Sequence, residues 1–417
     1  MTSAETVLLE QQSVPEFLKL AKADETLSGR SRVIVTLATP SRRALAKYLC
    51  LPATSVLDHL EQAFASAGVC CEVIDMSFAE AISRRLVTAE SSSSGLLLTS
   101  HCPGFALYAE KTQPESTVEL LSRVRSPDQI AGVLLKTVIP RLDQRMTEAL
   151  RGRMNRRAEI AKTLPASIVH ITISPCFDKK IEVLRENYKL ESDYTGRSSV
   201  PAVDLVLTTS EVIGLLKDCP SFIQNLRNSS LVISALGLRK SWGTAGTHVA
   251  GGGYAESVLS SANPGTWQHQ RNKDLSTFNS PGSRSVMLAY GFRNIQNIVR
   301  RLSDLQSTTR IVEIMACPGA CDYGGGQPKV GEVSKDRNND QIGRGGLLSR
   351  LRSIFCASEE IEKDPETLAS VVHVHKEQAD VVELLLSETA SYFGRPVDDV
   401  FSAKWSSLIG GGGSLKW

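Results

Sequence analysis

The 417-residue chain lacks the features that identify several common classes of protein. No apolar run approaches the ~20 residues that a membrane-spanning helix requires. The first residues have neither the basic start nor the apolar core of a signal peptide, so we expect no secretion. The formal net charge is only +2, which gives no electrostatic reason to expect binding to nucleic acid or to an anionic membrane.

Disulfide scaffolding is a further feature that the composition argues against. The chain has nine cysteines, an odd number, and none of them precedes Cys50. In a large chain without a visible secretion signal, this use of cysteine is typical of a reducing compartment. Clustered thiols in such a chain are more often metal-binding or catalytic than paired as disulfides.

Buried strands alternate with helical patterns along the chain. We expect strands at residues 33–37, 71–74, 96–99, 168–173, 204–207 and 311–315, and helices at 41–49, 55–67 and 126–150. Pro140 is the expected point of interruption in the last of these helices. This order predicts an α/β protein of two doubly wound lobes with parallel sheets that enclose a site, followed by a helical C-terminal segment.

The same pattern suggests where the domains divide. We expect the remnant of an N-terminal region at residues 1–27, followed by two α/β lobes at 28–164 and 165–330. A mostly helical segment at 331–409 and a flexible glycine-rich tail at 410–417 complete the expected order. Residues 239–284 are rich in Gly, Ser, Asn and Pro, which predicts an irregular functional loop.

Four cysteines occur at turns that contain proline, namely Cys102, Cys176, Cys317 and Cys321. The last two belong to residues 315–328 (MACPGACDYGGGQP), whose glycines let backbone amides come close to an anionic group. The first three follow predicted buried strands, and ligands of open α/β sheets bind at the carboxyl ends of strands. We therefore expect the four sulfurs to converge on one buried site between the lobes.

Four converging thiolates fit either a [4Fe–4S] cluster or a tetrahedral zinc ion. Ligands from three distant segments and close glycines favour the cluster, and Lys179 and Lys180 follow Cys176 to offset its negative charge. Zinc or purely structural thiols stay open as the alternative. His101 is adjacent to Cys102, and both a role beside the cluster and a simple packing role stay open for it. The remaining cysteines are interpreted as buried or incidental thiols, namely Cys50, Cys70, Cys71, Cys219 and Cys356.

Three motifs resemble those of the catalytic domain of iron-only hydrogenases. They are residues 99–104 (TSHCPG), 175–182 (PCFDKKIE) and 315–328, in which Ala320 replaces a glycine. Residues 108–111 (YAEK) and 290–296 (YGFRNIQ) resemble more specifically the eukaryotic relatives that act in cytosolic iron–sulfur protein assembly. That branch includes the nuclear prelamin A recognition factor-like proteins, and the resemblance covers nearly the whole chain.

The resemblance implies that Cys102, Cys176, Cys317 and Cys321 hold a [4Fe–4S] cubane. In hydrogenases the last of these ligands also bridges to a two-iron subsite, and a thiol at the position of His101 shuttles protons. With His101 in place of that thiol, and with the markers of the assembly branch, we expect no hydrogenase activity and no enzyme. The branch also has an N-terminal four-cysteine site that has no counterpart here, so we expect one cluster in this chain.

The resemblance also implies a function and partners. We expect a cluster-binding component of the cytosolic iron–sulfur protein assembly machinery that links an early scaffold to a late targeting complex. Its partners would be scaffold NTPases and the WD40-propeller and HEAT-repeat subunits of the targeting complex, with no nucleic acid and no membrane. We expect it in the cytoplasm and also in the nucleus. A hydrogenase-type redox enzyme and a zinc-stabilised interaction protein are the alternatives.

The chain ends in a glycine-rich segment followed by Leu415, Lys416 and Trp417. The targeting complex of this pathway recognises short C-terminal peptides that end in an aromatic residue, and this end resembles them. Lys416 departs from the acidic residue that usually precedes the aromatic one. A tail without a partner is the alternative interpretation.

Overall fold

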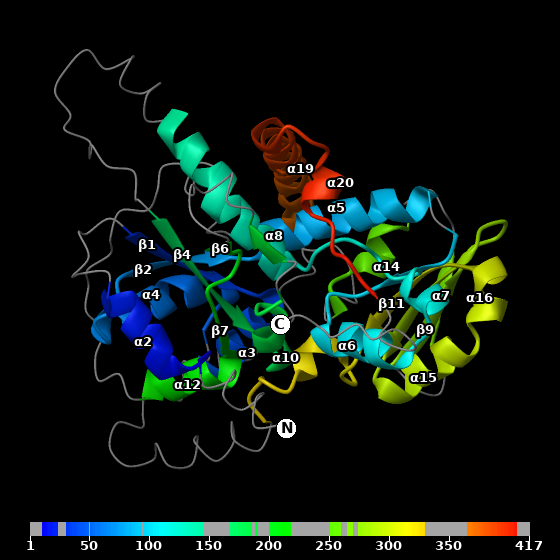
Figure 1. Cartoon of the computed structure of the whole chain (residues 1–417), viewed down its shortest axis with the longest axis horizontal. Coiled ribbons are helices and arrows are strands. Elements are labelled where there is room, and N and C mark those ends of the chain that lie inside the picture. The colour runs from blue at the N-terminus through cyan, green and yellow to red at the C-terminus, as the bar shows by residue number, and fades with distance from the viewer. Residues whose placement is uncertain are drawn as a thin grey trace.

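The structure is a computed structural model of the whole chain. It describes residues 11–23, 31–49, 51–93, 95–145, 167–185, 188–190, 200–217, 251–259, 265–269, 274–329 and 365–406. Two β-sheets lie at opposite ends of the molecule, and helices cover both of them (Figure 1).

The first sheet is entirely parallel, with the strand order β2-β1-β4-β7. Its strands are β1 (Ser31–Leu37), β2 (Cys71–Asp75), β4 (Ser167–Ser174) and β7 (Leu205–Thr208). Helices cover both faces, as continuous apolar strands require. One face packs on α2 (Val14–Ala23), α3 (Thr39–Leu49), α4 (Val56–Ser66) and α12 (Thr209–Lys217). The other packs on α5 (Ser77–Ser93), α8 (Pro127–Val133), the π-helical turn η2 (Leu134–Val138) and α19 (Pro365–Phe393).

The second sheet is mixed, with the order β3-β11-β10-β9-β8. Strands β3 (Leu97–Thr99), β11 (Thr309–Met315) and β10 (Ser285–Tyr290) run parallel. Strands β9 (Leu275–Asn279) and β8 (Thr266–His269) continue the sheet in antiparallel pairs. Its core includes residues of α6 (Pro103–Thr112), α14 (Tyr254–Ser257), α15 (Phe292–Arg300) and α16 (Leu302–Thr308).

The predicted fold class is confirmed, but the two sheets do not correspond to the predicted lobes at 28–164 and 165–330. Strands β4 and β7 join the first sheet, although both follow residue 164, and β3 joins the second sheet, although it precedes that residue. The chain therefore crosses between the sheets more than once. Local sequence periodicity carries no information about which sheet a strand joins, and the domain bounds themselves stay a prediction.

One further expectation is corrected, because part of residues 239–284, expected to be irregular, forms β8 and β9. The helix expected over 126–150 contains the π-helical turn η2, which lies just before Pro140, and its last residues lie outside the described part of the chain. The shorter elements are η1 (Ala53–Ser55), α7 (Glu115–Val118), α10 (Asp178–Glu182), β5 (Lys189–Leu190), β6 (Val200–Pro201), η5 (Ala320–Tyr323) and α20 (Val397–Val400).

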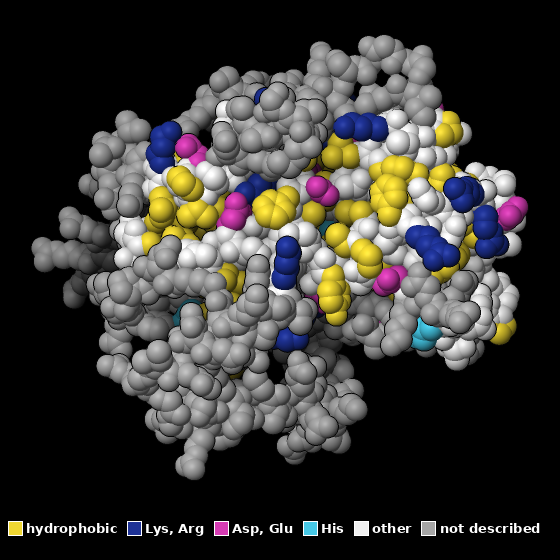
Figure 2. Space-filling model, turned by 90° about the horizontal axis from the view of Figure 1, so that it is seen from below, with side chains coloured by type: hydrophobic (Ala, Val, Ile, Leu, Met, Phe, Trp, Pro, Cys, Tyr) yellow, Lys and Arg dark blue, Asp and Glu magenta, His cyan; other side chains and the backbone are white. Residues whose placement is uncertain are grey.

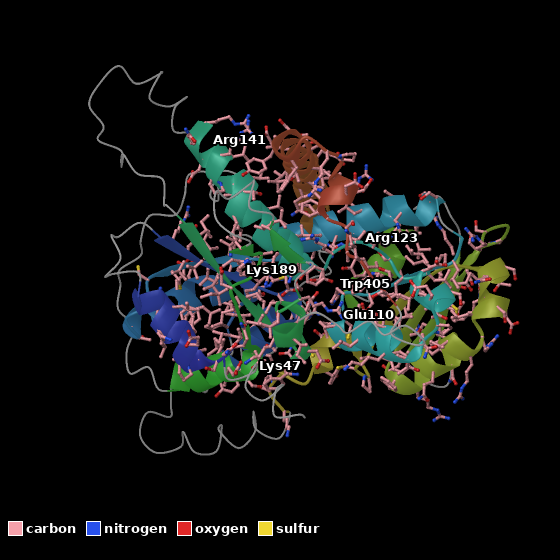
Figure 3. All side chains as sticks on the ribbon, viewed as in Figure 1. Lys47, Glu110, Arg123, Arg141, Lys189 and Trp405 are labelled. Carbon is pink, nitrogen blue, oxygen red and sulfur yellow. The ribbon has the colours of Figure 1, made fainter. Side chains whose placement is uncertain are left out.

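The expected C-terminal helical segment is present as α19 and α20. After α20 the chain returns toward the second sheet, where the indole of Trp405 donates a hydrogen bond to the carbonyl of Ser122 (2.8 Å) (Figure 3). None of the helices in the described ranges is both long enough and apolar enough to span a membrane. The tail at residues 410–417 lies outside the described residues.

Candidate metal centre

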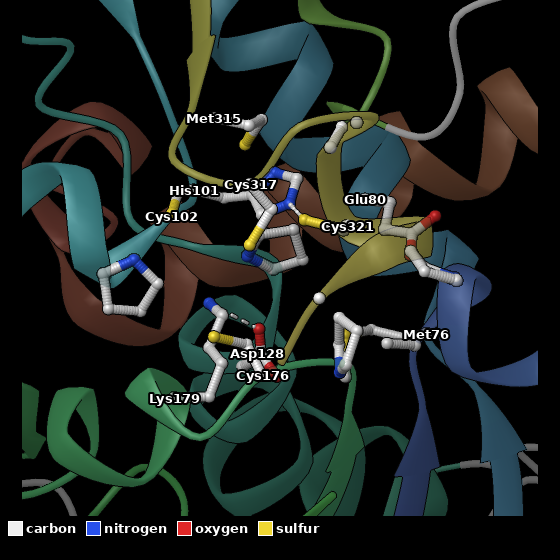
Figure 4. A pocket seen from close by; sticks show the side chains of 18 of the residues that line it. Met76, Glu80, His101, Cys102, Asp128, Cys176, Lys179, Met315, Cys317 and Cys321 are labelled. Carbon is white, nitrogen blue, oxygen red and sulfur yellow. Dashed lines mark hydrogen bonds and ion pairs between the residues drawn. The ribbon is translucent and has the colours of Figure 1, made fainter. Parts of the chain in front are cut away.

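A cavity lies where the two sheets approach each other, and all four predicted cysteines line it (Figure 4). Cys102, Cys317 and Cys321 line one part of it and Cys176 another. Other side chains that line it include Met76, Glu80, His101, Asp128, Lys179, Tyr254 and Met315. The expectation that these four residues share one cavity is met, whereas their role as ligands stays a prediction.

Strand ends position the four thiols. Cys102 follows β3 and precedes the first residue of α6. Cys317 follows β11, and Cys321 lies four residues further on in the turn η5. These three belong to the second sheet, whereas Cys176 follows β4 of the first sheet. A ligand held by all four would therefore join the two sheets.

The turn between Cys317 and Cys321 requires an unusual backbone. Gly319 has φ +69°, and a Cβ atom added there would overlap the ring of Tyr323. Ala320 follows with φ +58°, the only positive φ of a residue other than glycine among the described residues. L-residues avoid this left-handed region, so glycine would fit this position with less strain than alanine. The amide of Gly319 donates to Asp274 Oδ1 (2.8 Å), which fixes the turn to the rest of the second sheet.

Burial raises the pKa of all four thiols. The proximity of the other thiols raises the pKa of Cys176, Cys317 and Cys321 further. Backbone amides oppose this effect. The amide of Asp178 donates to Cys176 Sγ (3.4 Å), and the amides of Gly104, Phe105 and Ala316 lower the pKa of Cys102. Four crowded thiols that would repel each other as free thiolates are a favourable site for a cationic metal group.

One ammonium group lies at the wall of the cavity. The Nζ of Lys179 is 2.9 Å from Asp128 and 2.7 Å from Glu182, and all three side chains are buried. Burial alone would raise the pKa of Asp128, but Lys179 and two hydroxyl groups hold it at about 2. Lys180, which the sequence predicts to offset the charge of a cluster, points elsewhere: its Nζ pairs with Glu211 at 2.6 Å. Successive residues of α10 project in different directions, so only one of the two lysines reaches the cavity.

His101 lies at the cavity, with its Nε2 atom 3.3 Å from Cys321 Sγ. Burial lowers the pKa of its imidazole to about 3, and the Lys179 ammonium adds to this effect. Among the described residues its Nδ1 atom has no hydrogen-bond partner. The ring is 5.6 Å from the ring of Tyr254, measured between centroids.

Sequence reasoning missed the loop that covers this histidine. A Cβ atom at Gly252 would lie 2.7 Å from the His101 ring, and one at Gly251 would overlap the carboxyl group of Glu313. In the sequence, the glycines at residues 251–253 resemble only a phosphate loop without its usual Lys-Ser/Thr ending. Their neighbours His101 and Glu313 are far away in the sequence, so no local signal links them to the site. The structure gives them a packing role that depends on the absence of side chains.

Among the residues that the structure describes, no three His, Cys, Asp or Glu side chains come close enough together to hold one ion. A [4Fe–4S] cubane takes four thiolate ligands, and four thiols with backbone amides around them line this cavity, so the donor set fits such a cluster. Cys70 and Cys71 do not line the cavity, and Cys50, Cys219 and Cys356 lie outside the described residues.

Residues 31–325 match the family described as "Iron only hydrogenase large subunit, C-terminal domain". The cytosolic iron-sulfur assembly component 3 of Rattus norvegicus is 32% identical over 378 residues, which is 85% of this chain and 74% of the relative. Protein NAR1 of Arabidopsis thaliana is 32% identical over 397 residues, 88% of this chain and 77% of the relative.

Solved structures agree on the fold. A single-residue variant of the [FeFe]-hydrogenase HydA1 from Chlamydomonas reinhardtii superimposes with a TM-score of 0.59 over 95% of this chain and 99% of the hydrogenase, at 17% identity. The fold is thus that of an iron-only hydrogenase catalytic domain. The chain belongs to the iron-only hydrogenase-like family, in the branch whose relatives are named cytosolic iron–sulfur assembly components.

Proposed function

We propose that the chain is a cytosolic iron–sulfur assembly component that holds one [4Fe–4S] cluster through Cys102, Cys176, Cys317 and Cys321. The observation that supports this most strongly is the convergence of four thiols from three strand ends on one cavity. The names of the relatives supply the cellular role. A bound cubane would supply a one-electron redox centre.

The protein residues have separate roles around such a cluster. The four thiolates would hold it, and the amides near Cys102 and Cys176 would stabilise negative charge on their sulfurs. The ammonium of Lys179 lies at the same cavity and would offset the net negative charge of a cluster together with its four thiolate ligands. The glycines after Cys321 keep side chains away from the cavity wall: a Cβ at Gly324 would overlap the carbonyl oxygen of Pro175.

Spectra and iron analysis of anaerobically purified protein test this proposal. We expect close to four iron and four sulfide per chain and the electron paramagnetic resonance signal of a reduced cubane. Replacement of any one of the four cysteines by serine should remove most of the iron, whereas Cys71→Ser, outside the cavity, should not. Protein that binds zinc in place of iron, or that keeps its cluster in all four variants, would contradict the assignment.

Hydrogen chemistry is the second candidate, because the fold is that of hydrogenases. Against it, His101 occupies the position of the proton-shuttling thiol in the resembling motif, and an imidazole differs from a thiol in length and softness. We expect no sustained hydrogen evolution from reconstituted protein with a strong reductant, and such evolution would overturn the proposal.

Docking of partner proteins is part of the same proposal. Exposed aromatic side chains occur beside the ligands: Phe177, next to Cys176, is 42% exposed, and Tyr323, two residues after Cys321, is 70% exposed. Exposed aromatic residues are enriched at protein interfaces. Hydrophobic side chains also lie across the middle of the molecule when it is seen from below (Figure 2). We propose that the late targeting complex and the scaffold NTPases are the partners and that the protein acts in the cytoplasm and the nucleus.

The C-terminal residue Trp417 offers a direct test of the targeting partner. Its deletion should weaken binding to the WD40-propeller and HEAT-repeat complex and leave the cluster spectrum intact. A Lys416→Asp variant should bind more tightly, because acidic residues usually precede the aromatic one in such peptides. Equal binding by the chain with and without Trp417 would show that the tail is not the recognition element.

A further inference from the structure

His101 and Cys321 are 220 residues apart in the sequence and in contact in the cavity. The Nε2 atom of His101 is 3.3 Å from Cys321 Sγ, which is within hydrogen-bonding distance for sulfur. In the described part of the chain, the other hydrogen bonds to the four thiols come from backbone amides, such as that of Asp178 to Cys176. Cys321 thus differs from the other three thiols because its hydrogen-bond partner is a side chain.

The surroundings of the imidazole decide which nitrogen holds the proton. A neutral imidazole has one N–H group, on either Nδ1 or Nε2. Within the described part of the chain the buried Nδ1 atom has no partner, so a proton there would be an unsatisfied donor. A thiolate bound to a metal has no proton and can only accept a hydrogen bond. The proton therefore belongs on Nε2, directed at Cys321.

The ring cannot easily turn away from the sulfur. Gly252, with φ +102°, packs its backbone against the ring, and its carbonyl accepts a hydrogen bond from Arg84 (3.1 Å). The next residues are fixed as well: Tyr254 shares a hydrogen bond with Ser83 (2.9 Å). The amide of Ala255 donates to the buried Glu313 (2.8 Å). The glycine loop thus restricts the rotation of the imidazole.

We propose that His101 is a positioning residue that donates its Nε2–H to Cys321 Sγ and thereby raises the reduction potential of the cluster. The inference rests on the proposed function, because it requires a cluster held by Cys321. Reduction adds negative charge to the cluster, and a donor to a ligand sulfur stabilises the reduced form more than the oxidised form. Loss of the donor should therefore make the cluster harder to reduce.

A redox titration followed by electron paramagnetic resonance tests this proposal. His101→Leu removes the donor and fills most of the space of the imidazole with an apolar side chain, whereas His101→Gln keeps a side-chain N–H group. At a fixed potential we expect about tenfold less reduced cluster in His101→Leu, which for a one-electron couple is about 59 mV. His101→Gln should stay close to the wild type. His269→Leu, which replaces a histidine of β8 that does not line the cavity, is the matched control and should not shift the potential.

The wild-type protein provides a second measurement, for which His101→Gln is the control. With ¹⁵N-labelled histidine, pulsed electron paramagnetic resonance of the reduced cluster should detect a weak nitrogen coupling that disappears in His101→Gln. An unchanged potential in His101→Leu, or no such coupling in the wild type, overturns the inference. A wild-type protein without any cubane signal would instead count against the proposed function.

Discussion

Arg185 and Glu110 form a buried ion pair, 2.5 Å between Nη2 and Oε2, that joins the two sides of the cavity. Glu110 belongs to α6, the helix that follows Cys102, and Arg185 lies just after α10, the helix that follows Cys176. Both side chains are almost fully buried, at 5% exposure for the arginine and 3% for the glutamate. This pair thus connects the helix that follows Cys102, on the second sheet, with the segment that follows Cys176, on the first.

Replacement of Glu110 by Ala should therefore be strongly destabilising. It leaves the guanidinium of Arg185 buried without its partner, and loss of one member of a buried ion pair typically costs ~3–5 kcal/mol. The free energy of unfolding from urea denaturation measures the effect. Glu383→Ala is the matched control, because its pair with Arg85 is exposed and should contribute less than ~1 kcal/mol. Equal effects of the two substitutions would refute a structural role for the buried pair.

Gly319→Ala should distort the turn that presents Cys317 and Cys321. The new methyl group would meet the ring of Tyr323 in a left-handed conformation that costs an L-residue about 1–2 kcal/mol. We expect a lower unfolding midpoint and a lower iron content. Gly95→Ala, where no atom lies within 4 Å of the added Cβ, should be neutral or slightly stabilising. Wild-type iron content in Gly319→Ala would show that the turn does not need a glycine.

Glu313 should make the stability of the protein depend on pH. Burial raises its pKa from 4.5 to about 8, against the opposing hydrogen bonds from Ala255 and Tyr290. Between these two values the unfolded chain loses this proton while the folded chain keeps it. The free energy of unfolding should therefore fall by up to about 1.4 kcal/mol per pH unit as the pH rises from 4.5 to about 8.

A Glu313→Gln variant, which cannot ionise, tests this dependence. Its unfolding free energy, measured in urea at several pH values, should be flatter than that of the wild type over the same range. Glu119→Gln changes an exposed carboxylate and should keep the wild-type slope. Parallel curves for Glu313→Gln and the wild type would assign the pH dependence to other groups.

Removal of iron should loosen the contact between the two sheets. After treatment with a chelator and a reductant, we expect faster hydrogen exchange in the turns after β4 and β11, which contain Cys176 and Cys317. Strands β8 and β9, at the far edge of the second sheet, should exchange as before. Uniform exchange changes across the whole chain, or none at all, would argue against a tie between the sheets at the cavity.

Much of the site could be predicted because it depends on local signals. Three candidate ligands follow buried strands, and the strand-end rule for α/β sheets gathers such residues at one edge. The strands themselves are recognisable by their apolar runs, as in β1 and β4. The four cysteines could therefore be assigned to one cavity without any structure.

What could not be predicted depends on contacts between distant residues. The assignment of β3 to the second sheet follows from its pairing with β11, whose partner residues are far away in the sequence. Strand β8 was missed because most of its residues are polar and exposed. The sequence around Lys180 gives no sign of its pairing with Glu211. The sequence around Gly252 likewise gives no sign that this residue packs on His101. Such pairings are set by tertiary packing, and periodicity does not report them.

The division of the four thiols, one on the first sheet and three on the second, has a consequence for the life of the protein in the cell. A group held by all four thiols would connect the first sheet to the second. Without it, the contact between the two sheets depends on side-chain packing and on ion pairs such as Arg185–Glu110. A protein whose two sheets are held together less tightly unfolds locally more often and is degraded sooner. The abundance of this protein would then follow the iron supply, so that a cell short of iron would also lose part of its capacity to build iron–sulfur proteins.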